Sequence, residues 1–125
     1  SHYTCFLAAD TRLDMMYMPD AIDGIIQLMQ AEPTRLKHRN AFNVTAMNFT
    51  PDELAGEIRK SVPGFVIDYD VDPVRQAIAE SWPRAIDDSA ARAEWDWQPR
   101  YDLATMTADM LAKLGEKLKS PTRTT

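Results

Sequence analysis

The chain has 125 residues, of which 45% are hydrophobic, 14 are basic and 19 are acidic, so its net charge is −5. This length allows one domain with one core and is too short for two independent domains. The basic residues form no dense run, which argues against nucleic acid as a partner. We expect residues 1–119 to form a single compact unit and residues 120–125 to be a disordered tail.

The cysteine and histidine content limits the possible compartment and metal chemistry. Cys5 is the only cysteine, and His2 and His38 are the only histidines. Neither a disulfide framework nor a Cys/His zinc site can be built from this set. No apolar run approaches the roughly 20 residues that cross a bilayer, and the N-terminus lacks the basic-then-apolar order of a signal peptide. The sequence therefore predicts a cytoplasmic protein that has no membrane partner.

The first half of the chain alternates β-prone runs with one helical pattern. Residues 3–7 and 12–18 are predicted to form a hairpin across a polar turn. Pro19 suits the first turn of a helix that runs to about residue 31, and a buried strand is expected over residues 41–47. The apolar face of the helix is expected to pack on a sheet. This face carries Ile22, Ile25, Ile26, Leu28 and Met29.

The clearest local signal is the segment "TPDE". Thr50 is predicted to be the N-cap of a helix, with Pro51 at its first position and Glu53 at its third. Thr50 and Glu53 together make a capping box, which is a specific indication of a helix start. The helix is expected to end near Lys60.

The second half predicts one more strand and three more helices. The strand covers residues 64–71, and a short helix follows Asp72 through about Ser81. A further short helix is expected to be capped near Asp88. Asp102 is predicted to cap the last helix, which is amphipathic.

Several kinds of catalytic apparatus are missing from the sequence. Its four glycines stand at positions 24, 56, 64 and 115, so neither a GxGxxG dinucleotide loop nor a GxxxxGK phosphate loop is present. No lysine stands four residues after any tyrosine, which excludes a Tyr-x-x-x-Lys pair. The two histidines lie outside any acidic cluster, which leaves poor support for a Ser-His-Asp relay. We expect this chain alone to contain no catalytic residue and to bind no cofactor.

Two places in the sequence are candidates for a binding site. Asp10, Thr11, Arg12 and Asp14 gather hydrogen-bonding groups at the expected hairpin, where a guanidinium can bind a carboxylate in a fork. The alternative, which is the more common arrangement, is that Arg12 makes an internal ion pair that holds the turn. Trp82 precedes a proline and is either a lid over a pocket or, more commonly, a packing residue.

Three segments carry a likeness to a known family: "YTCFLAADTRLDMMYMPDAI", "AFNVTAMNFTPDELAGEI" and "VRQAIAESWPRAIDDSAARAEWDWQPRYDL". Together they resemble the C-terminal part of the short-chain-dehydrogenase type of L-threonine 3-dehydrogenase, within the NAD-dependent epimerase/dehydratase-like superfamily. The resemblance runs from about Tyr3 to Leu114. One departure is Asp14, where the family pattern has proline, and this change is expected either to loosen the hairpin or to be simple divergence.

The resemblance implies an α/β fold that forms the C-terminal part of an extended short-chain dehydrogenase. Such a part would hold a small substrate lobe plus an edge strand and helices of the Rossmann domain, and not a complete Rossmann fold. Residues 41–47 would be a strand of the cofactor domain's sheet. Arg12 would lie at the lobe boundary, with partners in the missing portion and from Asp10 or Asp14.

The resemblance also implies an activity for the full-length protein. Such an enzyme oxidises L-threonine to 2-amino-3-ketobutyrate with NAD, and its glycine-rich loop and Tyr-x-x-x-Lys pair lie N-terminal to the segment seen here. The implied partners are the missing N-terminal Rossmann portion, L-threonine and further copies of the chain in a homo-oligomer.

Two alternatives remain open at this point. The chain could be a non-catalytic interaction module that has kept the fold and dimerises or binds a partner through exposed apolar faces. It could also be a fragment of another epimerase/dehydratase family member. A nucleotide-sugar epimerase fits less well, since those enzymes usually have an Arg-Asp-Tyr and His-Val-Asp-Asp pattern where this chain reads "TRLDMMYMPD".

Overall fold

The structure is a computed structural model that describes residues 1–119. Its elements follow the predicted order of strands and helices, with a 3-10 turn added, and the predicted tail at 120–125 lies outside the described residues. The elements are β1 (His2–Cys5), β2 (Leu13–Met15), α1 (Met18–Gln30), η1 (Pro33–Arg35), β3 (Met47–Phe49), α2 (Pro51–Ser61), β4 (Val66–Tyr69), α3 (Pro73–Ser81), α4 (Ser89–Trp95) and α5 (Leu103–Lys119).

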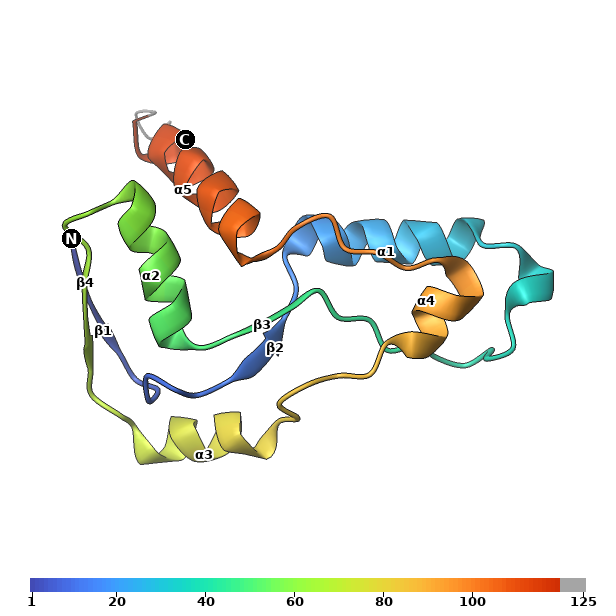
Figure 1. The fold of residues 1–125 in the computed structure, drawn as a ribbon, viewed down its shortest axis with the longest axis horizontal. Coiled ribbons are helices and arrows are strands. Elements are labelled where there is room, and N and C mark those ends of the chain that lie inside the picture. The colour runs from blue at the N-terminus through green and yellow to red at the C-terminus, as the bar shows by residue number, and fades with distance from the viewer. Residues whose placement is uncertain (120–125) are drawn as a thin grey trace, which may run out of the picture.

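The strands form two separate two-stranded sheets. β1 pairs in parallel with β4, with His2 opposite Val66, and β2 pairs antiparallel with β3, with Leu13 opposite Phe49. The predicted hairpin between β1 and β2 is therefore wrong. Each of the two strands finds its main-chain partner far along the sequence, and a local apolar pattern does not encode such long-range pairing. The loop between them carries the chain from one sheet to the other (Figure 1).

The strand expected over residues 41–47 is displaced, because β3 begins only at Met47. The residues before β3, Thr45 among them, form hydrogen bonds with side chains instead of pairing with a neighbouring strand. The Thr45 carbonyl accepts a hydrogen bond from Trp97 Nε1 at 3.0 Å, and the Thr45 hydroxyl donates to Asp14. β3 has an antiparallel partner and, within residues 1–119, no parallel one.

The predicted capping box is confirmed. The backbone N–H of Glu53 donates to Thr50 Oγ1 at 3.2 Å, and the N–H of Thr50 donates to Glu53 Oε2 at 3.0 Å. These two bonds satisfy two of the N–H groups that a helix start leaves without partners. They also fix the Glu53 carboxylate at the end of β3.

Two further predicted caps are confirmed with their side-chain bonds, and a third is confirmed in position alone, because α4 starts directly after Asp88. The Asp72 side chain accepts from the N–H groups of Val74 and Arg75, and Asp102 Oδ1 accepts from Thr105 N at 2.8 Å. Asp88 occupies the N-cap position of α4 but makes no side-chain cap bond there. Its carboxylate accepts from Arg92 Nε at 2.9 Å, one turn along the helix.

The packing of α1 differs from the expectation. Asp20 and Gly24 are the buried residues of this helix, whereas Ile25 is 65% exposed and Met29 is 79% exposed. The prediction that the apolar face packs on a sheet is therefore wrong for the part of the chain that the structure describes. α1 instead uses its narrow face at Gly24 and Leu28 to contact an aromatic core.

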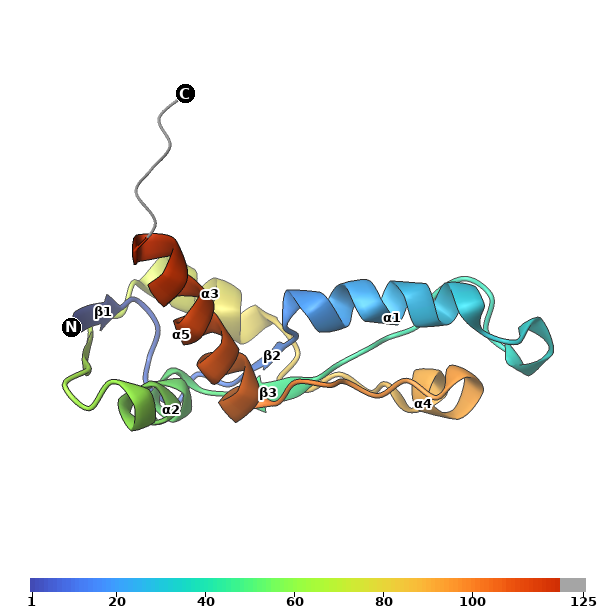
Figure 2. The ribbon, with the colours of Figure 1, turned by 90° about the horizontal axis from the view of Figure 1, so that it is seen from above.

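That aromatic core lies between α1 and α4. It centres on Ala91, Trp95 and Trp97, and the edge of the Phe42 ring meets Trp95 at a centroid distance of 5.9 Å. Figures 1 and 2 show α1 and α4 as an arm that extends from β2 and β3, while β1, β4, α2 and α5 gather at the other end. α2 packs against α5 at that end. That residues 1–119 form a single compact unit stays a prediction.

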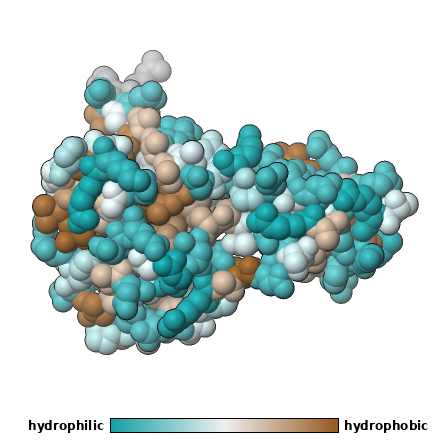
Figure 3. Space-filling view, in the orientation of Figure 1, coloured by the Kyte–Doolittle hydropathy of each residue, from teal (hydrophilic) through white to brown (hydrophobic). Residues whose placement is uncertain are grey.

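Residues 1–119 therefore have an α/β fold with small sheets and five α-helices, and do not form a complete Rossmann fold. Among residues 1–119, no helix combines the length and the apolar character needed to cross a membrane. Figure 3 shows apolar patches open to solvent on the part of the molecule where β1, β4, α2 and α5 gather.

Candidate functional site

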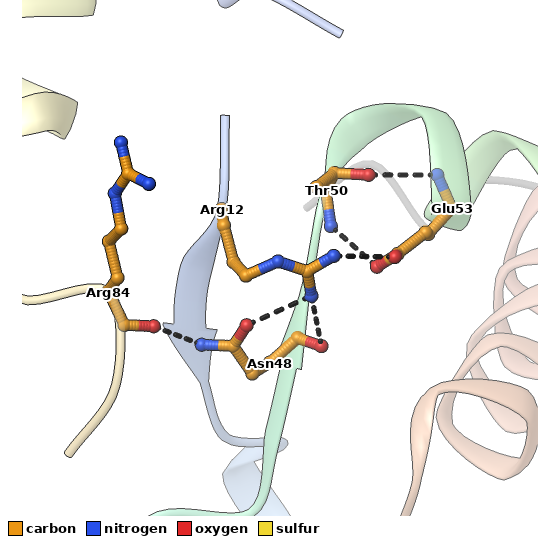
Figure 4. Close-up of polar contacts among 5 residues, drawn as sticks. All are labelled: Arg12, Asn48, Thr50, Glu53 and Arg84. Atoms are coloured by element: carbon orange, nitrogen blue, oxygen red, sulfur yellow. Dashed lines mark hydrogen bonds and ion pairs between the residues drawn. The ribbon is translucent and has the colours of Figure 1, made fainter. Parts of the chain in front are cut away.

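The Arg12 side chain is held by β3 and by the start of α2 (Figure 4). Its Nη2 atom donates to Glu53 Oε1 at 2.6 Å, and its Nη1 atom donates to Asn48 Oδ1 at 3.0 Å and to the Asn48 carbonyl at 3.3 Å. The expected partners Asp10 and Asp14 make no ion pair with Arg12, so that part of the prediction is wrong. The correct partner could not be read locally, because the β2–β3 pairing brings α2 to this position.

Glu53 has two functions at once, since it completes the capping box and pairs with Arg12. The hydrogen bond from Arg12 lowers the pKa of the Glu53 carboxyl, and the Thr50 N–H lowers it further. The carboxylate thus stays charged and keeps the guanidinium in place. Both side chains are close to half exposed, so the pair contributes modestly to stability and mainly fixes geometry.

Asn48 and Asp14 anchor the segment that follows α3. The Asn48 Nδ2 group donates to the Arg84 carbonyl, and Asp14 Oδ2 accepts from Ile86 N at 2.7 Å. Because Asp14 also accepts from the Thr45 hydroxyl, it joins three segments rather than loosening one. The residue that departs from the family pattern therefore has a defined structural role.

Gln76 ties the loop after β1 to α3. Its Oε1 atom accepts from Ala8 N at 2.9 Å, and its Nε2 atom donates to Thr11 Oγ1 at 3.0 Å and to Glu80 Oε1 at 2.9 Å. Thr11 is buried, so its hydroxyl needs such a partner. These bonds fix the loop that carries Asp10 against α3, the helix that precedes Trp82.

Four of the candidate residues from the sequence come together around one pocket of about 100 Å³. The residues that line it are Asp10, Thr11, Arg12, Gln76, Ala79, Glu80, Trp82 and Arg84. Trp82 makes no lid over a closed cavity, since 55% of its surface is exposed. Sequence reasoning missed Gln76, Glu80 and Arg84. The i, i+4 spacing of Gln76 and Glu80, which places both on one helix face, was the signal that could have indicated two of them.

A second, apolar hollow of about 450 Å³ lies between the two sheets and α2. Its lining includes Cys5, Leu13, Phe49, Leu54 and Ile67, together with other apolar residues of the same elements. Such a surface is suited to packing rather than to chemistry, because it lacks charged side chains.

The described residues do not fit a dinucleotide phosphate site. Gly24, Gly56 and Gly115 lie within helices, and none of the described glycines has a positive φ. The junctions from β3 to α2 and from β4 to α3 contain no glycine, whereas a phosphate-binding turn needs one for close backbone approach. Nor does the described chain hold any group of three or more His, Cys, Asp or Glu side chains placed to bind a metal ion.

Comparisons with known proteins identify relatives of greater length. No family model matches the chain. An uncharacterized epimerase/dehydratase of Staphylococcus haemolyticus is 56% identical over 115 residues, which cover 92% of this chain and 36% of that protein. The L-threonine dehydrogenase of Clostridium difficile is 55% identical with a TM-score of 0.89, over 93% of this chain and 36% of that one. A GalE-like L-threonine dehydrogenase from Cupriavidus necator is 54% identical with a TM-score of 0.84, over 90% of this chain and 36% of that one.

The chain therefore spans 36% of the length of these relatives. The likeness extends through almost all of its own length and includes the backbone as well as the sequence. The chain corresponds to the C-terminal part of the GalE-like type of L-threonine dehydrogenase, among epimerase/dehydratase relatives.

Proposed function

We propose that this chain is the substrate-lobe part of an NAD-dependent L-threonine 3-dehydrogenase that converts L-threonine to 2-amino-3-ketobutyrate. The observation that carries the proposal is sequence identity above 50% with two L-threonine dehydrogenases across at least 90% of the chain. In this reaction the carbon that bears the hydroxyl gives a hydride to NAD, and the hydroxyl gives up its proton. The product is a ketone, and NADH is released.

The chain alone is inactive under this proposal. It has no Tyr-x-x-x-Lys pair for the proton transfer, and its described residues offer no glycine-rich turn for the cofactor phosphates. Both would come from an N-terminal Rossmann portion, which is the first partner that we propose. The chain's own part is to bind and orient the substrate.

The pocket beside Arg12 is the proposed place for that binding. Asp10, Thr11, Arg12 and Trp82 line it, and Arg12 is fixed by Glu53 and Asn48. Charged and polar groups that are held by their neighbours orient a small polar substrate better than flexible groups do. The full-length enzyme is further proposed to be a cytoplasmic homo-oligomer in threonine catabolism.

NAD reduction with L-threonine tests the proposal, followed by the absorbance of NADH. The assay compares this chain alone with the same chain joined to the N-terminal portion. Activity only in the joined protein is the expected result. A folded joined protein that leaves NAD unreduced would overturn the proposal.

One observation favours a second candidate of another class, a non-catalytic interaction module. Ile22, Ile25 and Met29 expose most of their surface on one helix, which is unusual unless a partner covers them. The genomic sequence upstream separates the two candidates. A reading frame that encodes a glycine-rich loop and a Tyr-x-x-x-Lys pair favours the enzyme, and a start codon near Tyr3 favours the module.

The third candidate, a different epimerase/dehydratase, is supported by the name of the curated relative alone. The joined protein distinguishes it from the leading proposal in the same assay. A protein that converts a nucleotide sugar and leaves L-threonine unchanged would favour this third candidate.

A further inference from the structure

The pocket beside Arg12 contains one cation and one anion that have no partner. The Arg84 guanidinium and the Asp10 carboxylate both line it, and neither makes a hydrogen bond or an ion pair with any other side chain or backbone group of residues 1–119. No ion pair joins them to each other. Of the other charged groups, Arg12 pairs with Glu53, and the Glu80 carboxylate accepts a hydrogen bond from the Gln76 amide but makes no ion pair within residues 1–119. A ligand that carries both signs of charge would therefore complete this pocket.

We infer that the pocket binds the zwitterionic head of an α-amino acid, with its carboxylate on Arg84 and its ammonium group on Asp10. An α-amino acid carries these two charges on one carbon, and a guanidinium binds a carboxylate through two parallel N–H donors. The inference rests on the proposed function, for which the amino acid is L-threonine. It adds Arg84 as the residue that selects for the carboxylate.

The size of the pocket agrees with a small ligand. Its volume of about 100 Å³ is well below the roughly 300–1,000 Å³ of sites for drug-sized molecules. Trp82 supplies an apolar surface at the same pocket, where the aliphatic part of the amino acid can lie. A nucleotide sugar would need far more room.

Arg84 is the better carboxylate ligand of the two arginines in the pocket. The Nη1 and Nη2 atoms of Arg12 already donate to Asn48 and Glu53, so Arg12 has little capacity left. In Figure 4 the Arg84 guanidinium makes no bond to the other four residues drawn, while the Arg84 carbonyl accepts from Asn48. The backbone bond from Ile86 to Asp14 fixes the other side of this segment. Asn48 is therefore a positioning residue, because it joins Arg12 to the backbone of Arg84.

The first test uses the full-length protein and the variant Arg84→Gln. With L-threonine we expect KM to rise about 10- to 100-fold while kcat changes little, since the lost contact is a charged hydrogen bond to the substrate. With 1-aminopropan-2-ol, which has no carboxylate, kcat/KM stays at the wild-type value. Arg84→Lys keeps the charge without the fork and gives an intermediate KM. Arg39→Gln, outside this pocket, is the matched control and leaves all values unchanged.

The second test uses Asp10→Asn and a substrate without the ammonium group. Asp10→Asn raises KM for L-threonine but not for 3-hydroxybutanoate. The inference is overturned if Arg84→Gln behaves like Arg39→Gln. It is also overturned if Arg84→Gln lowers kcat/KM by the same factor for L-threonine and for 1-aminopropan-2-ol, because the arginine would then have no contact that depends on the carboxylate.

Failure of the proposed function can be told apart from failure of this inference. If the wild-type full-length protein reduces no NAD with L-threonine, the proposed function fails, and calorimetric titration with L-threonine then decides on the pocket. If the wild-type protein binds L-threonine and Arg84→Gln does not, the inferred binding site is supported even though the proposed activity fails. Absence of binding to the wild-type protein would overturn it.

Discussion

Gly24 lies directly against the indole ring of Trp97. A Cβ atom at position 24 would come within 3.0 Å of Trp97 Cζ3 and 3.4 Å of Cη2. The ring cannot easily move away, because Trp97 is only 2% exposed and its Nε1 donates to the Thr45 carbonyl at 3.0 Å. Glycine is therefore required here for the close approach of a helix to an aromatic ring.

Gly24→Ala should lower the free energy of unfolding. Overpacking costs about 1–3 kcal/mol, which is more than the ~1 kcal/mol that alanine gains over glycine inside a helix. The measurement is urea unfolding followed by tryptophan fluorescence at low protein concentration. Gly56→Ala is the matched control, since nothing lies within 4 Å of its added Cβ. The control should raise the free energy of unfolding by about 0.5–1 kcal/mol. If both substitutions change this free energy in the same direction, the contact between position 24 and Trp97 does not require glycine.

The elements that sequence reasoning placed correctly are those whose signals are local. The capping box at Thr50 and Glu53 fixed the start of α2, and Asp72 fixed the start of α3, because both caps are made within four residues. The errors concern long-range pairing. The partner of β1 lies in β4, and the partner of Arg12 lies on α2, and no local pattern indicates either.

The candidate site could be predicted in part for the same reason. Asp10, Thr11 and Arg12 are adjacent in sequence, so a shared location was predictable, and Trp82 was singled out because it precedes a proline. Arg84 was missed although it follows Trp82 by two residues, because its lack of a partner is visible only in three dimensions.

A second prediction concerns Asp20, which is fully buried and was not singled out from the sequence. Its two oxygens accept from Arg100 N and Tyr101 N, both at 3.0 Å, and so tie α1 to the segment before α5. Asp20→Ala leaves both donors without a partner and should lower the free energy of unfolding by about 2 kcal/mol or more. Asp23→Asn, on the more exposed part of the same helix, should change it by less than about 0.5 kcal/mol. Similar losses in the two variants would contradict the assigned role.

The pH dependence of stability provides a third prediction, at Glu53. The pKa of this carboxyl is lowered in the folded chain, first by the hydrogen bond from Arg12 and then by the N–H of Thr50. A group with a lowered folded pKa stabilises the protein above its unfolded pKa, and this contribution is lost as the pH falls through the folded pKa. The difference in unfolding free energy between the wild type and Glu53→Gln should be largest at neutral pH and should decrease below about pH 4.5. A difference that stays constant from neutral to acidic pH would show that the carboxylate is not held in this way.

A fourth prediction is that the chain alone gives no measurable heat on titration with NAD. The described residues provide no glycine-rich turn at the N-terminus of a helix that follows a strand, and that turn is what cradles the pyrophosphate. The full-length protein is the positive control in the same calorimeter. Tight binding by the chain alone would mean that the cofactor is held by residues other than those of a Rossmann turn.

The exposed face of α1 gives the last prediction. Ile22, Ile25 and Met29 lie on one side of this helix and are each more than half exposed, and such a face favours association with another apolar surface. The chain alone should therefore self-associate as its concentration rises, as measured by light scattering. Ile25→Lys should reduce this association, because it places a charge in the centre of the face. Gln30→Lys adds the same charge on the same helix without removing an apolar side chain, and should leave the association unchanged. A chain that remains monomeric at high concentration would show that α1 does not cause association, and an equal effect of both lysines would show that net charge is the cause.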